Sequence, residues 1–144
     1  MPYVRIWTHC VWGTKNRKPL LSKDIKYKVL NHIMENAKNK SIYIDLINGS
    51  NDHLHCLISL KAEQNISKVI QLIKGESSYW INKNKITPSK FEWADEYFAV
   101  SISDSDISNV KRYIKNQEEH HRKKTWQNEY DDFMNKYCFV EYGG

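Results

Sequence analysis

Two histidines separated by one residue are the feature of the sequence that most directly suggests chemistry. His53 and His55 lie in the stretch SNDHLHCLISLK at positions 50–61, which is otherwise rich in strand-forming apolar residues. Side chains two positions apart on a strand share one face, so both imidazoles would be directed at the same place. Such a pair could bind one cation through two nitrogens, but a metal site needs at least one or two further donors. Two hydrogen-bonded histidines without a metal remain the alternative.

The further donors are sought in the stretch ISNVKRYIKNQEEHHRKK at positions 107–124. Ile107, Val110 and Ile114 fall at helical spacing and would form a narrow apolar stripe that packs the helix on the sheet. Tyr113 and Gln117 are four residues apart, so they share a helical face at the edge of that stripe. A helix in this place would bring the Gln117 amide oxygen toward a metal and hold the Tyr113 hydroxyl one turn away. The alternative is a half-buried tyrosine and an ordinary surface glutamine.

The remaining histidines are kept out of the metal set. His9 would lie on the first strand, beside the strand of the histidine pair, where it could orient a ligand, contact DNA or serve only the structure. His120 and His121 stand near the end of the last predicted helix in HHRKK. Positive charge there is favoured by the helix macrodipole and by contact with phosphate.

The elements that would position these residues follow from hydrophobic periodicity. Alternating apolar residues predict strands at 3–12, 42–46, 53–60 and 97–103, and apolar residues spaced by three and four predict helices at 23–40, 66–83 and about 106–124. One more amphipathic segment is predicted at 126–137. The first six elements have the order of a ferredoxin-like (RRM-like) α+β fold, with an antiparallel sheet whose first and third strands are central and with an additional C-terminal helix. The 144 residues fit a single domain spanning 1–144.

The charge of the chain favours a phosphate-bearing partner. Lys and Arg number 22 against 17 Asp and Glu, and the stretch TKNRKPLLSKDIKYK is especially basic. A solvated positive face is the simpler alternative. The nine Tyr and five Trp could offer stacking surfaces for unpaired bases, although most would lie in the core. The candidate phosphate contacts are Lys15, Arg17, Lys18, Lys74, Lys111 and Arg112.

Cysteine usage and hydropathy bear on the compartment. Cys10, Cys56 and Cys138 are far apart and include no CxxC pair, which argues against a disulfide framework or a thiolate zinc site. No apolar stretch approaches the length of a membrane span, and the N-terminus lacks the features of a secretion signal. We therefore expect a cytoplasmic protein that does not contact a membrane.

Five stretches taken together resemble one known family. HLHCL and YIKNQEEHH, together with THCVWGTKNRKPLL, IKGESSYWIN and FEWADEYFAVSIS, resemble the HUH-type single-tyrosine transposases of the insertion-sequence-200/605 family. The stretches occur in the family's order without a large insertion, so the resemblance covers essentially the full chain. It implies a ferredoxin-like fold in which the last helix is catalytic.

The resemblance also implies residue roles and partners. His53, His55 and Gln117 would bind a divalent cation, for which Mg²⁺ or Mn²⁺ suits the oxygen-rich remainder of the shell. Tyr113 would attack the scissile phosphate of single-stranded DNA, form a 5′-phosphotyrosine link and release a 3′-hydroxyl. The DNA would carry hairpin ends, and the protein would work as a homodimer in which the tyrosine helix can complete the partner's site.

Three other functions stay open at this level. A ferredoxin-like sheet with aromatic residues can bind single strands without catalysis. A histidine-based hydrolase is disfavoured because Leu57 stands where a third alternating histidine would be expected. A domesticated relative that acts on chromosomal repeats would share every motif with a mobile transposase.

Overall fold

A four-stranded antiparallel sheet forms the centre of the structure, which is a computed structural model describing residues 2–117, 128 and 131–132. Its spatial order is β2-β3-β1-β4, so the first and third strands are central, as predicted for the ferredoxin-like fold. The strands are β1 (Ile6–Gly13), β2 (Tyr43–Gly49), β3 (His53–Leu60) and β4 (Phe98–Ile102). The helices are α1 (Lys23–Asn39), α2 (Ile66–Lys83) and α3 (Ile107–Lys115).

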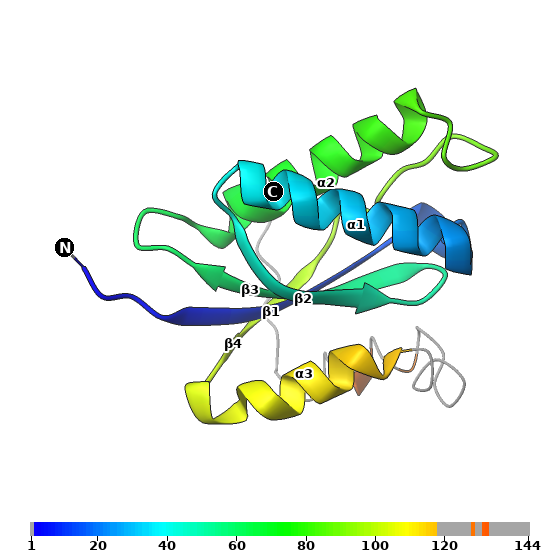
Figure 1. The fold of residues 1–144 in the computed structure, drawn as a ribbon. Helices are drawn as coiled ribbons and strands as arrows, with labels where there is room; N and C mark the ends of the chain where they lie inside the picture. Colours follow the sequence, from blue (N-terminus) through cyan, green and yellow to red (C-terminus); the bar gives the residue numbers. More distant parts are fainter. Residues whose placement is uncertain (1, 118–127, 129–130, 133–144) are drawn as a thin grey trace.

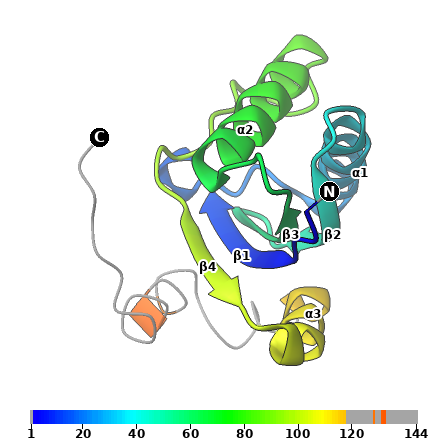
Figure 2. The same ribbon diagram turned by 90° about the vertical axis from the view of Figure 1, so that its left-hand side faces the viewer.

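The three helices divide between the two faces of the sheet. Helices α1 and α2 cover one face, and α3 crosses the other (Figures 1 and 2). None of the helices in the described part of the chain combines the length and apolar character that crossing a membrane requires.

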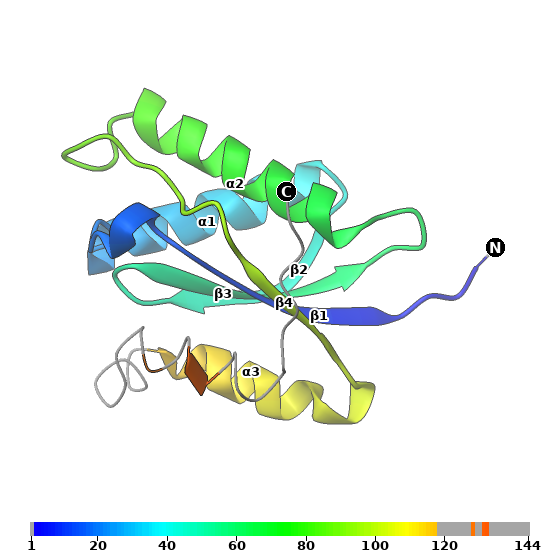
Figure 3. The same ribbon diagram turned by 180° about the vertical axis from the view of Figure 1, so that it is seen from behind.

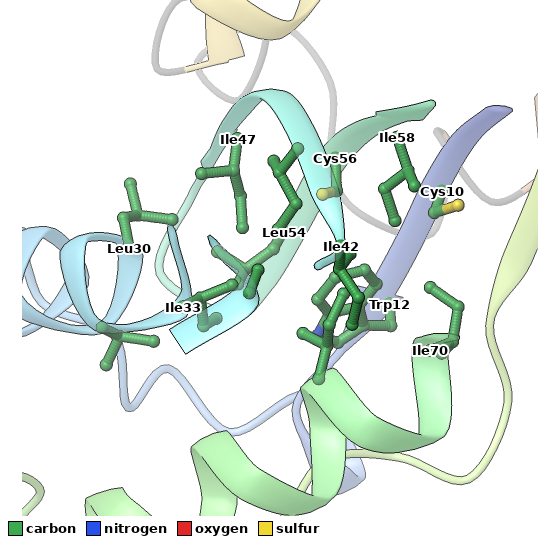
Figure 4. Packing of buried hydrophobic residues seen from close by; sticks show 14 of the residues in the cluster. Cys10, Trp12, Leu30, Ile33, Ile42, Ile47, Leu54, Cys56, Ile58 and Ile70 are labelled. Atoms are coloured by element: carbon green, nitrogen blue, oxygen red, sulfur yellow. The ribbon is translucent and has the colours of Figure 1, made fainter. Parts of the chain in front are cut away.

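The hydrophobic core lies between the sheet and helices α1 and α2. Alternate residues of β1 and β3, including Cys10, Trp12, Leu54 and Cys56, point into it and are fully or almost fully buried (Figure 4). Burial raises the pKa of the Cys10 thiol to about 12, so this cysteine is protonated and unreactive at neutral pH. Because side chains alternate along a strand, the residues between these core positions face α3.

Most predicted elements are confirmed within a few residues. Helix α2 begins after Asn65, whose side chain accepts a hydrogen bond from the Lys68 amide at 2.8 Å. Helix α2 continues without a break through Gly75. A Cβ at this position would meet no neighbouring atom, so packing does not require a glycine there. Strand β1 begins at Ile6 and not at Tyr3, because Ile6 already pairs with Leu60, the last residue of β3.

Helix α3 confirms the predicted last helix over the part that the structure describes. It spans Ile107–Lys115 with Asn116 as its C-cap, and the predicted continuation from residue 118 to residue 124 lies outside the described residues. No side-chain hydrogen bond caps the start of α3, and the carboxylate of Asp106 accepts from the side chain of Asn109 instead. His120 and His121 lie outside the described residues, as does almost all of the predicted segment 126–137.

Candidate active site

The pairing of β1 with β3 places three histidines on the face covered by α3. His55 is opposite Val11, His53 is opposite Gly13, and His9 is opposite Leu57. His9 and His55 are therefore diagonal neighbours, and His9 Nε2 lies 2.9 Å from His55 Nδ1. All three rings are buried, so their nitrogens lie in a site of low dielectric.

The ring of His53 is oriented by the turn that precedes it. Its Nδ1 lies 2.7 Å from a carboxylate oxygen of Asp52 and 2.8 Å from the hydroxyl of Ser50. A carboxylate accepts the Nδ1–H proton, which leaves Nε2 as the atom with a lone pair for a metal. The Nδ1 atom of His55 faces His9 in the same way, so Nε2 is the corresponding atom on both rings.

The turn between β2 and β3 is closely packed against the histidine strand. A Cβ on Gly49 would lie 2.2 Å from the carbonyl oxygen of His53, a distance that real side chains do not reach. The buried ammonium of Lys26 donates to the Gly49 carbonyl at 3.1 Å. Lys26 is one of the cations of the basic stretch at positions 14–28, and its side chain supports this turn.

Tyr113 lies over two of the histidines. Its ring centroid is 5.4 Å from that of His55 and 6.1 Å from that of His9, both in edge-on orientation. The Tyr113 ring is half-buried, and α3 places it over the histidines of its own chain.

Two contacts from β2 hold α3 in this position. The Asn48 side chain donates to the carbonyls of Ile114 at 3.0 Å and Lys115 at 3.2 Å, the last two residues of the helix. The ammonium of Lys111 lies 2.9 Å from a carboxylate oxygen of Asp45, and this hydrogen bond raises the pKa of Lys111. Sequence reasoning missed the roles of Ser50, Asp52 and Asn48, which stood out only as turn or strand residues.

Gln117 lies on the buried side of the chain just beyond α3. It is 1% exposed, and its amide nitrogen donates to the Tyr113 carbonyl at 3.2 Å. Within the described part of the chain, His, Cys, Asp and Glu form no group of three that could hold a metal. Gln117, the third donor that the sequence predicted, is buried on the same side of the sheet as α3, and its role as a ligand stays a prediction. Two buried imidazoles with oriented rings and one amide fit a divalent cation chemically.

The six predicted phosphate contacts fall into separate places. Lys15, Arg17 and Lys18 are exposed in the turn after β1, where Lys15 also pairs with Glu92 at 3.0 Å. This turn is tight, and Asn16 and Arg17 have φ angles of 57° and 54°.

Lys111 and Arg112 lie on α3, and Lys74 lies on α2. Lys74 is half-buried and donates to the carbonyls of Ala94 and Asp95, and burial lowers its pKa. The role of all six residues in binding DNA remains a prediction.

Comparison with known proteins identifies relatives of the whole described domain. The family model described as "Transposase IS200 like" matches residues 3–117. A crystal structure of "a putative transposase from deinococcus radiodurans r1" has a TM-score of 0.64 at 20% identity, covering 81% of this chain and 95% of that one. The structure of a REP-associated tyrosine transposase bound to a REP hairpin also has a TM-score of 0.64, at 18% identity, covering 84% of this chain and 72% of that one. The search of curated proteins gave no match.

Proposed function

The chain belongs to the family of IS200-like transposases, and from this premise we propose that it cleaves and rejoins single-stranded DNA with Tyr113 as the nucleophile. One observation carries the proposal. Tyr113 is the tyrosine whose ring lies edge-on to both His55 and His9, over the buried histidine face of the sheet. A tyrosine with a purely structural role would not need two buried imidazoles beside it.

We propose that His53, His55 and Gln117 hold a divalent cation, Mg²⁺ or Mn²⁺. These three ligands are neutral, so the bound ion would keep its full positive charge and act as a Lewis acid toward the phosphate oxygens. The contribution of the protein is orientation. Asp52 and Ser50 fix the ring of His53, and His9 fixes the ring of His55.

The proposed reaction is a transesterification that conserves the number of phosphodiester bonds. The phenol oxygen of Tyr113 bonds to phosphorus while the bond from phosphorus to the 3′ oxygen breaks. The phenol gives up its proton, and the leaving oxygen gains one to become a 3′-hydroxyl. The same hydroxyl, or that of another strand, can attack the 5′-phosphotyrosine link and rejoin DNA. No nucleotide cofactor is required, since the energy of the bond is retained.

The partner we propose is single-stranded DNA that carries a hairpin. The similar REP-associated transposase is bound to a hairpin, and this chain has a net charge of +5. Basic side chains on the turn after β1 and on α3 lie near the histidine face, where phosphate neutralisation would hold a strand over the site. A homodimer remains part of the proposal through the family resemblance.

The test is a search for the covalent intermediate. Labelled hairpin DNA from the flanks of the gene is incubated with and without Mn²⁺ and run on a denaturing protein gel. Wild type should give a metal-dependent labelled protein band, and Tyr113→Phe should give none, because it lacks the attacking oxygen. Tyr79→Phe is the matched control, since Tyr79 is 64% exposed on α2.

Two results would contradict the proposal. A band of undiminished intensity in Tyr113→Phe would exclude this nucleophile, and unchanged metal-dependent cleavage in the His53→Ala, His55→Ala double variant would exclude the metal assignment. DNA retarded on a native gel without a covalent band, in any metal, would favour a non-catalytic binding module.

A further inference from the structure

A pocket of about 280 Å³ lies beside the histidine face and has no part in the reaction as proposed so far. It is formed by residues 11–17, at the end of β1 and in the turn after it, and by residues 94–98, which lead into β4. Strand β4 runs along β1 at the edge of the sheet, as Figure 3 shows.

Two residues of the pocket lining lie close to the proposed metal ligands. Val11 pairs with His55 on one side and with Phe98, another lining residue, on the other. The three residues form one row across the sheet and share the face covered by α3. Two strand spacings separate His55 from Phe98, or about 10 Å. The next nucleotides of a DNA strand held at the histidines would therefore be within reach of the pocket lining.

One end of the pocket is tied directly to the support of His53. The Thr14 amide donates to the Asp52 carbonyl at 2.8 Å, and the Thr14 hydroxyl donates to the Lys18 carbonyl at 2.8 Å. The Asp52 carboxylate in turn contacts His53. The basic turn and the histidine are thus positioned by the same short segment.

Residues 94–98, which form the other side of the pocket, are held in place by a side chain of α2. The Lys74 ammonium donates to the carbonyls of Ala94 at 2.6 Å and Asp95 at 3.2 Å, and it lies 5.9 Å from the centroid of the Tyr97 ring. The Ala94 amide donates to the Gly13 carbonyl at 2.9 Å. These bonds preform the pocket, so a ligand does not have to order it on binding.

The lining groups combine both signs of charge with aromatic residues. Lys15 and Arg17 lie on one side, while Asp95 and Glu96 lie on the other. A phosphate alone would be attracted by the first pair and repelled by the second. A nucleotide can meet both requirements, because its phosphate faces the cations while amino groups on its base donate to the carboxylates. Tyr97 and Phe98 add aromatic lining suited to an unstacked base.

Resting on the proposed function, we propose that this pocket binds one unstacked nucleotide next to the scissile phosphate and selects a base with an exocyclic amino group. Adenine, cytosine and guanine carry such a group. Thymine has no such group, and its single N3–H donor lies between two carbonyl oxygens, which the carboxylates of Asp95 and Glu96 would repel. The pocket would then read one base of the cleavage site directly through the protein.

The experiment scans the base identity of each nucleotide on both sides of the cut and measures cleavage rates with wild type. We expect one position at which amino-bearing bases are cleaved at least about ten-fold faster than thymine or an abasic site. In the Asp95→Asn, Glu96→Gln double variant this preference should fall below about two-fold, since amides both donate and accept. Glu35→Gln, on the exposed face of α1, is the control that should keep the preference.

Binding provides an arm that does not depend on cleavage. The same oligonucleotides are titrated into Tyr113→Phe without metal, with and without the two pocket substitutions. A position-specific loss of affinity for thymine that disappears with the pocket substitutions supports the pocket even if no covalent product ever forms, which would contradict only the proposed function. Cleavage and binding that ignore base identity at every position, or a preference that survives both substitutions, would overturn the pocket proposal.

Discussion

His53 and His55 share a face, but different groups fix their orientation. A carboxylate and a hydroxyl from the preceding turn hold His53, whereas the imidazole of His9 holds His55. A carboxylate partner favours one tautomer strongly, because it can only accept a proton. His9 can either donate or accept, so the tautomer of His55 depends on that of its neighbour. The tautomer that leaves Nε2 free of a proton for metal binding is therefore favoured more strongly at His53 than at His55.

This difference predicts that Asp52 contributes to metal affinity without contacting the ion. Asp52→Asn keeps the size of the side chain but removes the negative charge that orients and polarises His53. We expect Mn²⁺ to bind about 10–100-fold more weakly. Isothermal titration of Mn²⁺ into Tyr113→Phe protein with and without Asp52→Asn measures the change. Asp24→Asn, in the exposed first turn of α1, is the control, and equal affinities in all three proteins would refute the role of Asp52.

At the residue scale, sequence periodicity singled out the side chains for which chemical roles are proposed, but it missed those that orient them. His53, His55, Tyr113 and Gln117 stood out because spacings of two and four place residues on common faces of strands and helices. Asp52 lies in a turn, and the composition of the sequence there predicts a turn without indicating which side chain contacts His53. Its contact with His53 depends on backbone geometry that spacing alone does not determine.

At the scale of elements, α3 depends on β2 for its position. The Asn48 side chain donates to the carbonyls of Ile114 and Lys115, the last two residues of α3. The ion pair between Lys111 and Asp45 fixes the helix one turn earlier. Strand β2 thus holds the described part of the tyrosine helix in place over the histidines.

Removing the Asn48 contact should loosen this helix. Asn48→Ala removes two hydrogen bonds, and we expect a loss of about 1–2 kcal/mol in the local stability of α3. Hydrogen exchange of the α3 amides, followed by mass spectrometry, should become faster while β1 and β3 keep their protection, and covalent adduct formation should slow. Asn31→Ala, on the exposed side of α1, serves as the control. Unchanged exchange in α3 would show that Asn48 does not hold the helix.

The accuracy of the predicted element bounds follows from what ends each element. Helix α2 begins at a local signal, the side-chain cap of Asn65, so its start was predictable from the sequence. The start of β1 is set by the end of β3, through the pairing of Ile6 with Leu60. The Ile114 carbonyl in α3 accepts from Asn48, which is 66 residues away in the chain. A strand end or a helix contact that depends on a distant partner leaves no local pattern in the sequence.

At the scale of the whole molecule, one face of the sheet forms the hydrophobic core and the other carries the candidate active site. One face, with Cys10 and Cys56, packs into the apolar core under α1 and α2, while His9 and His55 on the same strands face α3. The alternation of a central strand pair therefore supplies the core and the site together. Figure 2 shows the two layers on opposite sides of the sheet.

The packing of α3 on its own sheet predicts that the tyrosine acts on DNA bound to the same chain. Mixing Tyr113→Phe with the His53→Ala, His55→Ala variant should then fail to restore the covalent adduct, because neither chain has both parts. Each variant is first tested alone for DNA binding and thermal unfolding, to show that it is folded. Recovery of adduct in the mixture would instead show exchange of tyrosine helices between the subunits of a dimer.

In the tight turn after β1, one side chain, Arg17, affects the stability of the fold and the proposed affinity for DNA in opposite directions. Arg17 has a φ of 54°, a left-handed conformation that costs a residue with a Cβ roughly 1–2 kcal/mol. Glycine adopts it without strain, so Arg17→Gly should raise the free energy of unfolding in urea by about 1 kcal/mol. The same change removes a cation from the proposed DNA path, so the dependence of log affinity on log salt should become shallower by about 1. A variant that is more stable but binds DNA more weakly would mean that the strained conformation of Arg17 lowers stability while its side chain contributes to DNA binding. Selection for thermal stability alone would then reduce the function of this turn.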